Sequence, residues 1–341
     1  CLARKTEVEL NLFKEKPSKQ MIVNKERIGE RTAYITFMAP YAQIDSLWFK
    51  GIHSDKVITQ FNQVQDSLEI WINDSRKQPD TLFLNVKYMK TDSLGLLNSF
   101  VEEIRLPKPK KSAGKSSKKD IKKEDTTAVV TITAKPETVE QYGFVMEFKY
   151  PLVEDGFDSL SFRYLNPKQQ EFKVKYKVEK DSLNLRKYVV RPDVEMLPGY
   201  EYFLKIPHRK FKDINGFYND STEVKVSLPN DDKLSMMSLA LTNVHNKYIV
   251  DLLNEKRDKV IRSYIIDKDT TLPFPYLKAG KYSIRITEDI NRNGMVDTGI
   301  LLEHKQPEKV RYYKLADGTF LIDIPEMTEL EQNIDLSEMF K

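Results

Sequence analysis

A short loop in the last quarter of the sequence concentrates the side chains most able to do chemistry. Counting Asp289 as position 1, Asn291, Asn293 and Asp297 occupy positions 3, 5 and 9, and Met295 at position 7 offers its backbone carbonyl oxygen. Calcium loops present oxygen ligands at these positions. The sequence therefore predicts a candidate calcium site formed by Asp289, Asn291, Asn293, Met295 and Asp297.

The loop differs from an EF-hand in one important way. Position 12 is Ile300, where an EF-hand has a bidentate glutamate. Glu288, Glu303 or water would therefore have to complete the coordination. The alternative is a loop without metal, in which Asp and Asn side chains satisfy backbone amides and tolerate left-handed backbone. The sequence predicts no other cofactor.

Motifs for catalysis are missing from the sequence. There is no Gly-x-Ser-x-Gly, no His-Glu-x-x-His and no glycine-rich phosphate loop. The single cysteine, Cys1, has no nucleophile motif around it, and the four histidines are far apart in the sequence. Folding could still bring a pair of carboxylates together. We nevertheless expect a protein that is not an enzyme, and we assign no catalytic residue.

The elements that would position the loop are strands. Tyr282, Ile284 and Ile286 alternate before the loop, as the inward-facing residues of a half-buried strand do. Similar runs recur along the whole chain, separated by Asp, Ser, Asn and Pro, which is typical of β-sandwiches. Trp48 and Trp71 are predicted to anchor a core, with an aromatic sugar-binding platform as the alternative. No apolar run is long enough to cross a membrane as a helix.

A repeat divides the chain into domains. The tripeptide Asp-Ser-Leu begins at residues 45 and 66 and again at 158 and 181, and tandem copies of one domain explain these similar spacings. The sequence predicts an all-β protein of tandem Ig-like β-sandwich domains followed by a transthyretin-like β-sandwich. The predicted boundaries are 1–106 and 128–230 for the Ig-like domains, 107–127 for a disordered Lys-rich linker, and 231–341 for the last domain.

The net charge of +4 comes from the linker. Between Lys108 and Asp125 there are eight lysines and three acidic residues, so the rest of the chain is nearly neutral. Because the folded parts carry almost no net charge, the sequence does not predict a basic surface that binds nucleic acid. The linker itself has too few apolar residues to offset its ordering entropy.

Three segments resemble a known family. They are LPGYEYFLKI with DINGFYNDS, YIVDLLNEKRDKVIR, and YLKAGKYSIRITEDINRNGMVDTG followed by LLEHKQPEKVRYY, all within residues 197–313. The chain resembles the C-terminal region of Bacteroidetes cell-envelope proteins with a bacterial (SbsA-type) Ig-like domain. The resemblance implies a transthyretin- or prealbumin-like last domain and a location at the outer membrane, on its periplasmic face or at the cell surface.

The resemblance also bears on attachment and partners. Membrane contact would be through a lipid anchor, either on Cys1 or, as the resemblance favours, on an upstream segment. We expect a non-catalytic scaffold or adhesion module of three sandwiches in a row, with an unidentified envelope protein as partner and a place in an outer-membrane assembly. The rival hypothesis is a protein that binds or processes surface glycans.

Overall fold

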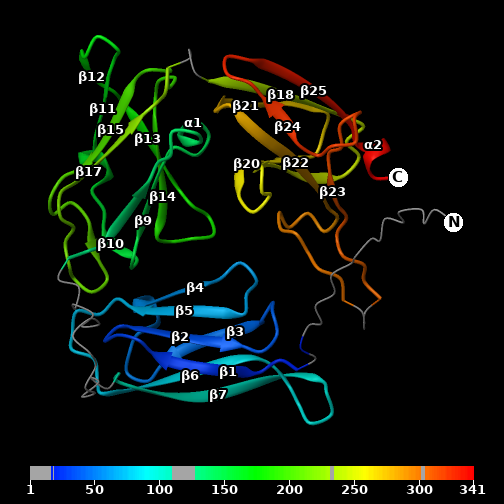
Figure 1. The fold of residues 1–341 in the computed structure, drawn as a ribbon. Helices are drawn as coiled ribbons and strands as arrows, with labels where there is room; N and C mark the ends of the chain where they lie inside the picture. The colour runs from blue at the N-terminus through cyan, green and yellow to red at the C-terminus, as the bar shows by residue number, and fades with distance from the viewer. Residues whose placement is uncertain (1–16, 18, 110–126, 231–233, 301–303) are drawn as a thin grey trace, which may run out of the picture.

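The computed structural model describes residues 17, 19–109, 127–230, 234–300 and 304–341. These residues form three β-sandwiches, each with its own buried apolar core (Figure 1). The predicted fold class, tandem Ig-like sandwiches followed by a transthyretin-like sandwich, is confirmed. Most of the predicted linker lies outside the described residues.

The first domain has the strand order of an Ig constant-type sandwich. One sheet has the order β1-β2-β5-β4 and the other β3-β6-β7, so its seven strands divide as ABED and CFG do in that fold. Inward-facing Ile35, Ile70, Leu84 and Val86 are fully buried between the sheets. The strands are β1 (Ile22–Arg27), β2 (Thr32–Phe37), β3 (Ile44–Phe49), β4 (Val57–Phe61), β5 (Ser67–Ile72), β6 (Thr81–Thr91) and β7 (Leu97–Pro107), with a 3-10 turn, η1 (Ser54–Lys56).

The second domain repeats this order with additions. Its sheets are β13-β14-β9-β8 and β12-β11-β15-β17, and a small β10-β16 pair lies beside them. The strands are β8 (Val130–Thr133), β9 (Phe144–Phe148), β10 (Leu152–Glu154), β11 (Ser161–Leu165), β12 (Glu171–Lys173), β13 (Tyr176–Lys180), β14 (Lys187–Pro192), β15 (Glu201–Ile206), β16 (Lys212–Asp213) and β17 (Thr222–Ser227). Two short helical segments complete it, α1 (Val139–Tyr142) and η2 (Phe157–Ser159).

The repeated tripeptides occupy equivalent places in the two Ig-like domains. Asp45 lies in β3, and Asp158 lies in η2, directly before β11. These two strands occupy equivalent places, because β3 pairs with β6 as β11 pairs with β15. Those at Asp66 and Asp181 lead into β5 and β14, which pair with β2 and β9 in the same way. The repeat in the sequence therefore reflects a repeat of topology.

The third domain contains one parallel strand pair. Its sheets are β21-β18-β25 and β20-β19-β22-β23, with β24 also paired to β22. The first and last strands, β18 and β25, are the parallel pair. The elements are β18 (Ser235–Thr242), β19 (Lys247–Asn254), β20 (Val260–Ile266), β21 (Thr270–Leu277), β22 (Gly280–Asp289), β23 (Val310–Tyr312), β24 (Ile322–Ile324), β25 (Glu329–Asp335) and α2 (Leu336–Met339).

The second domain contacts both of the others, and the three domains lie around a corner rather than in a straight row (Figure 1). Figure 1 shows the first domain below the second and the third beside it. At the lower junction, the Arg186 side chain lies 3.0 Å from the Glu69 carboxylate and its guanidinium lies over the Trp71 ring at 5.4 Å. Trp71 is buried at this junction rather than within the core of the first domain, and Trp48 remains 39% exposed. The expectation that both tryptophans anchor a core was therefore wrong.

Candidate functional site

The predicted calcium loop follows β22 and is organised by Asp289. This residue ends the strand on the face opposite the core, and its side chain is fully buried. Its Oδ1 accepts a hydrogen bond from the Asn293 amide (3.0 Å) and its Oδ2 accepts one from the Gly294 amide (2.8 Å). Lys247 Nζ lies 3.7 Å from the same carboxylate. Asp289 therefore fixes the turn through backbone amides, which is the role expected of a loop without metal.

The other predicted ligands converge on Asp297. The side-chain amides of Asn291 and Asn293 both donate to Asp297 Oδ2, at 2.5 and 2.7 Å. The Met295 amide donates to Asn293 Oδ1 at 2.7 Å. The structure thus brings the four side-chain ligands of the prediction into one hydrogen-bonded loop. Gly294, with φ of +76°, supplies the left-handed turn that position 6 requires.

A fifth acidic or amide residue, Glu308, joins this loop and was not predicted. Its carboxylate accepts hydrogen bonds from the amides of Ile290 (3.0 Å) and Asp297 (2.9 Å), and only 8% of the residue is exposed. Burial raises the pKa of Glu308 above its ordinary value, and the nearby charges of Asp297 and Asp289 raise it further. Strand β23 returns alongside β22, with Val310 opposite Thr287, and this pairing brings Glu308 back to the loop.

The two glutamates expected to complete the calcium coordination, Glu288 and Glu303, are not seen to join the loop. The Glu288 carboxylate accepts a hydrogen bond from Asn246 Nδ2 at 2.6 Å, so it is engaged outside the loop. Glu303 lies outside the described residues. Among the residues that the structure describes, no group of three His, Cys, Asp or Glu side chains is placed to hold a metal ion. Calcium at this loop remains a prediction.

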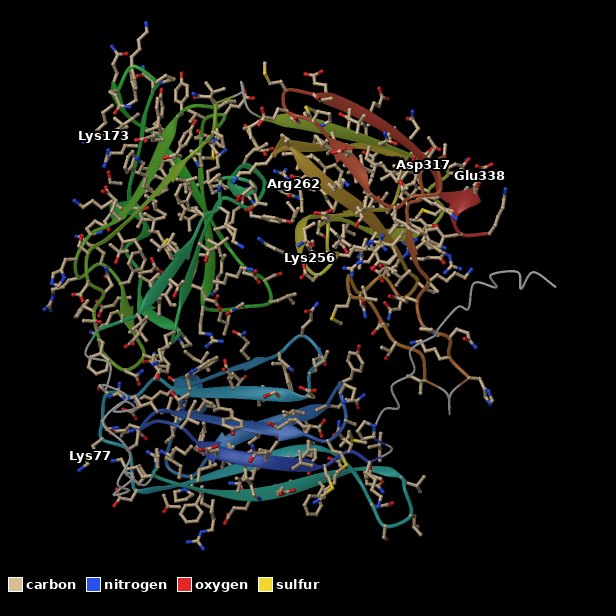
Figure 2. All side chains as sticks on the ribbon, in the orientation of Figure 1. Lys77, Lys173, Lys256, Arg262, Asp317 and Glu338 are labelled. Atoms are coloured by element: carbon tan, nitrogen blue, oxygen red, sulfur yellow. The ribbon has the colours of Figure 1, made fainter. Side chains whose placement is uncertain are left out.

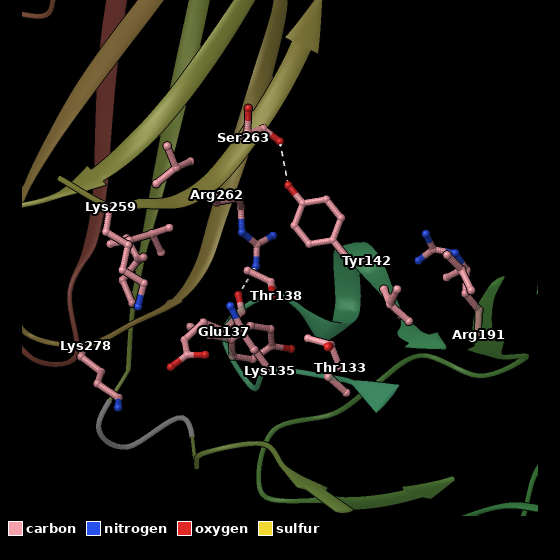
Figure 3. Close-up of a pocket in the computed structure, with 18 of the residues that line it drawn as sticks. Thr133, Lys135, Glu137, Thr138, Tyr142, Arg191, Lys259, Arg262, Ser263 and Lys278 are labelled. Atoms are coloured by element: carbon pink, nitrogen blue, oxygen red, sulfur yellow. Dashed lines mark hydrogen bonds between the residues drawn. The ribbon is translucent and has the colours of Figure 1, made fainter. Parts of the chain in front are cut away.

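A groove lies between the second and third domains, and no pattern in the sequence indicates it. It has a volume of about 660 Å³. One wall is the outward face of the sheet that contains β8, β9 and β14, and the other is formed by β20 and by the end of β21 (Figure 3). Valine, isoleucine and tyrosine side chains contribute much of the wall, among them Val145, Val189, Val260 and Tyr282.

Basic side chains outnumber acidic ones in the lining of this groove. It contains six basic and only two acidic side chains: Lys135, Lys187, Arg191, Lys259, Arg262 and Lys278 against Glu137 and Glu147. Lys187 and Arg191 lie 3.3 and 3.4 Å from carboxylates, those of Asp181 and Glu179. Within the described part of the chain Lys135, Lys259 and Lys278 form no ion pair. Figure 3 shows these three lysines on both sides of the groove.

The two walls are joined by direct hydrogen bonds. Arg262 is only 2% exposed and lies at the junction of the second and third domains (Figure 2). It donates to the backbone carbonyl of Glu137 at 2.6 Å, and its guanidinium lies 3.3 Å from the Glu140 carboxylate. Gln141 Nε2 and the Tyr142 hydroxyl both donate to the backbone carbonyl of Ser263, at 3.1 and 3.2 Å. The groove is therefore framed by contacts that hold its walls together.

A close approach of backbones shapes the second-domain wall. Gly143 ends α1 with φ of +68°, and a Cβ at this position would lie 2.9 Å from both the Val190 carbonyl oxygen and a Val189 methyl carbon. A larger residue would push β9 away from β14. Gly143 thus allows the chain to pass from the interdomain helix into the sheet that lines the groove.

Fold and site together define a multi-domain β-sandwich protein with a basic interdomain groove. No protein-family model matches the chain, and no curated protein does. Among solved structures it is similar to the MG0-NIE-MG1 domains of native alpha-2-macroglobulin from Escherichia coli, with 14% identity, a TM-score of 0.23, and coverage of 57% of this chain and 97% of that one.

Two further solved structures are similar at the same level. Domains A168–A170 of titin share 11% identity, with a TM-score of 0.17 and coverage of 79% of this chain and 91% of that one. Domains 1–6 of the surface layer protein SbsC share 12% identity, with a TM-score of 0.20 and coverage of 89% and 58%. Likenesses this distant support no conclusion about function. No helix in the described residues is long and apolar enough to cross a membrane.

Proposed function

We propose that the protein is a non-catalytic binding scaffold of the bacterial cell envelope, acting within an outer-membrane assembly, and that it binds an anionic ligand in its interdomain groove. The observation that carries the proposal is the excess of basic side chains along that groove. Three of its lysines, Lys135, Lys259 and Lys278, have no carboxylate partner among the described residues. Opposing walls of like charge attract an anion that neutralises both.

The fixed position of the walls supports a binding role. A preorganised site loses less conformational entropy when a ligand binds, because its side chains are already held apart at the required distance. Arg262 and the bonds from Gln141 and Tyr142 to Ser263 supply this preorganisation. The apolar part of the walls, from Val145 and Val260, suits a ligand that has an uncharged body between its anionic groups.

Charge reversal in the groove tests the proposal. The probe is dextran sulfate, with neutral dextran as its uncharged counterpart, and binding is measured by calorimetry. We expect the variant Lys135→Glu, Lys259→Glu, Lys278→Glu to bind the sulfated polymer at least about tenfold more weakly than the wild type, since each phosphate- or sulfate-like contact is electrostatic and salt-dependent.

The matched control places the same charge change elsewhere. Lys77, Lys173 and Lys205 are exposed and lie away from the groove, the first two as labelled in Figure 2. The variant with all three changed to Glu has the same net charge as the groove variant and should keep wild-type binding. Equal loss in both variants would mean that only the overall charge matters, and the groove would not be the site.

Glycan binding is the second candidate function, and Trp48 supports it. The ring lies on β3 and is 39% exposed, whereas Trp71 is buried and is not accessible to a sugar. An exposed aromatic ring can stack on the apolar face of a sugar. Retention of the wild type on a neutral glucan column, lost in Trp48→Ala and kept in the groove variant, would favour this function.

Calcium at the Asp289 loop is the remaining element of the proposal. Asp289, Asp297 and Glu308 belong to the same loop, and the oxygens of Asn291 and Asn293 lie there too. In the described structure these carboxylates bind amide groups and do not face one point, so they would have to turn toward a bound ion. Calcium prefers six to eight oxygen ligands, so backbone carbonyls and water would have to supply the others. Its role would be structural, since it would brace the loop between β22 and β23.

A further inference from the structure

The hairpin of β6 and β7 extends past the rest of the first domain. Strand β3 pairs with β6 only as far as Ile44 and Tyr88, whereas β6 and β7 continue to pair as far as Thr91 and Leu97. Three further residues of strand take the hairpin about 10 Å past β3. Gln20 still pairs with the last of them, Thr91, so the part that projects from the domain is the turn over residues 92–96. Figure 1 shows this tip projecting from one end of the sandwich.

The projecting tip is apolar. Leu94 is 81% exposed, Leu96 60% and Leu97 54%, while Phe100 and Val101 are each 47% exposed. Single exposed apolar residues are ordinary, but a contiguous group of this kind marks a contact surface in a soluble domain. Alternation along β7 places Leu97 and Val101 on one face of the hairpin and Phe100 on the other. Exposed apolar side chains therefore lie on both faces of the hairpin, beside the polar Asn98 and Ser99.

The turn holds these side chains outward. Asp92 Oδ1 accepts hydrogen bonds from the amides of Leu94 (2.8 Å) and Leu96 (2.9 Å), and Asp92 Oδ2 accepts one from Asn98 Nδ2 (2.7 Å). The Asp92 amide in turn donates to the Leu96 carbonyl at 2.9 Å. A turn with this many internal bonds keeps one conformation, so the leucines are presented by a defined structure.

We infer that this tip inserts into the surface of a lipid bilayer. A protein groove would cover one face of a hairpin, whereas fluid lipid can surround a convex tip that is apolar on both faces. Elements that lie in a membrane interface bury their apolar side chains about 5–10 Å deep. The exposed leucines at the turn, Leu94, Leu96 and Leu97, are the side chains that would occupy this depth.

The base of the hairpin suits the polar headgroup region. Lys90 Nζ lies 4.6 Å from the centre of the Phe100 ring and 3.2 Å from the Glu102 carboxylate, and Lys25 lies 3.5 Å from the same carboxylate. Lysines at such a boundary keep their charge in water while their stems cover apolar surface. Because both lysines already have an acidic partner, insertion is driven by the apolar tip rather than by attraction to anionic lipid.

The inference rests on the proposed envelope location, and the entry of the chain into the domain agrees with it. The Gln20 amide donates to Thr91 Oγ1 at 2.7 Å, and the Thr91 amide donates to the Gln20 carbonyl at 2.9 Å. The chain that precedes Gln20 therefore joins the fold beside the base of the hairpin. An anchor on that side would bring the tip to the same bilayer.

Flotation of the full chain with lipid vesicles tests the inference. The vesicles consist of phosphatidylethanolamine with phosphatidylglycerol, or of phosphatidylcholine alone. We expect the wild type to float with both, in low and in high salt, because apolar insertion is only weakly screened. The variant Leu94→Ser, Leu96→Ser, Leu97→Ser should lose about nine-tenths of the bound fraction, since transfer of each leucine from water is favourable.

The control removes apolar side chains that are equally exposed elsewhere. Leu183 is 69% exposed, Met327 70% and Val194 45%, and none lies in the first domain. The variant with these three changed to Ser should float like the wild type. Both variants should melt at the wild-type temperature, because none of the changed side chains belongs to a buried core.

Two results would overturn the inference. One is equal flotation of the wild type and the hairpin variant. The other is a wild type that does not float but forms dimers by light scattering, with the dimers lost in the hairpin variant, because the tip would then contact a second copy of the chain. Loss of dextran sulfate binding belongs to the groove alone, so either proposal can fail while the other stands.

Discussion

Arg262 Nη2 donates a 2.6 Å hydrogen bond to the backbone carbonyl of Glu137, across the junction of the second and third domains. The arginine belongs to β20 and is almost completely buried, whereas Glu137 lies just before α1. A buried cation with a charge-assisted bond is costly to leave unpaired. This contact therefore links the position of one sandwich to that of the next.

Removing the charge of Arg262 should loosen this junction. Arg262→Met keeps an apolar stem of similar length but leaves the Glu137 carbonyl and the Glu140 carboxylate without their donor, a loss of about 2 kcal/mol in docking free energy. Small-angle scattering should then give a larger radius of gyration. Lys256→Met, an exposed change in the neighbouring turn, is the control and should leave the radius unchanged.

The contact between Arg186 and Trp71, at the junction of the first and second domains, can be followed by tryptophan fluorescence. In a Trp48→Phe background only Trp71 emits, and its ring is 1% exposed beneath Arg186. Arg186→Ala removes the cation–π contact and the ion pair with Glu69, so we expect a red-shifted emission and a loss of about 1 kcal/mol. Arg191→Ala, five residues further along the chain in the wall of the groove, should leave the emission at its original wavelength.

Calcium is predicted to raise the melting temperature through the Asp289 loop. The variant Asp297→Asn, Glu308→Gln removes two of the three carboxylates and should abolish the rise, measured by calorimetry with and without millimolar calcium. Magnesium is the ionic control, because it requires smaller, octahedral geometry and keeps more of its own water. A wild-type melting temperature that is the same with calcium and with chelator would exclude the site.

Without calcium, Glu308 should make stability fall as pH rises. Burial and the charges of Asp297 and Asp289 raise the pKa of this carboxyl in the folded state. A raised pKa in an acid means that its favourable contribution is present below the ordinary pKa of glutamate and is lost as pH rises through the folded value. The difference in melting temperature between wild type and Glu308→Gln should therefore shift in favour of the variant from acidic to neutral pH.

Added calcium provides a check on this pH dependence. Bound cation would stabilise the carboxylate form, so the decline in wild-type stability toward neutral pH should become smaller. A decline of the same size in wild type and Glu308→Gln would show that other carboxylates cause it.

The architecture could be predicted because it is encoded in local patterns. Alternation within single strands and the recurrence of Asp-Ser-Leu about one domain apart require no knowledge of which strands pair. The turn at Gly294 could be predicted for the same reason, since ligand spacing and backbone conformation are properties of a few consecutive residues.

The features that could not be predicted from the sequence depend on contacts between residues far apart in the chain. Glu308 reaches the Asp289 loop only because β23 pairs with β22, and Ile300 at the expected position drew attention to nearby glutamates instead. Trp71 lies on the outer face of β5, where Arg186 of the second domain covers it, so its burial depends on a contact between domains that no local pattern encodes. The groove is formed by two domains together, and no single segment of sequence encodes it.

The parallel pairing of β18 with β25 has a consequence for how the third domain is made. Met236 pairs with Glu329 and Thr242 with Asp335, so the first strand of the domain receives its neighbour from the far end of the same domain. Ile334, within β25, and Leu336, directly after it, belong to the domain's core. Such long-range closure is entropically slow. During translation this sandwich therefore cannot be completed until nearly all of it has left the ribosome, and until then the central strand β18 keeps one unpaired edge.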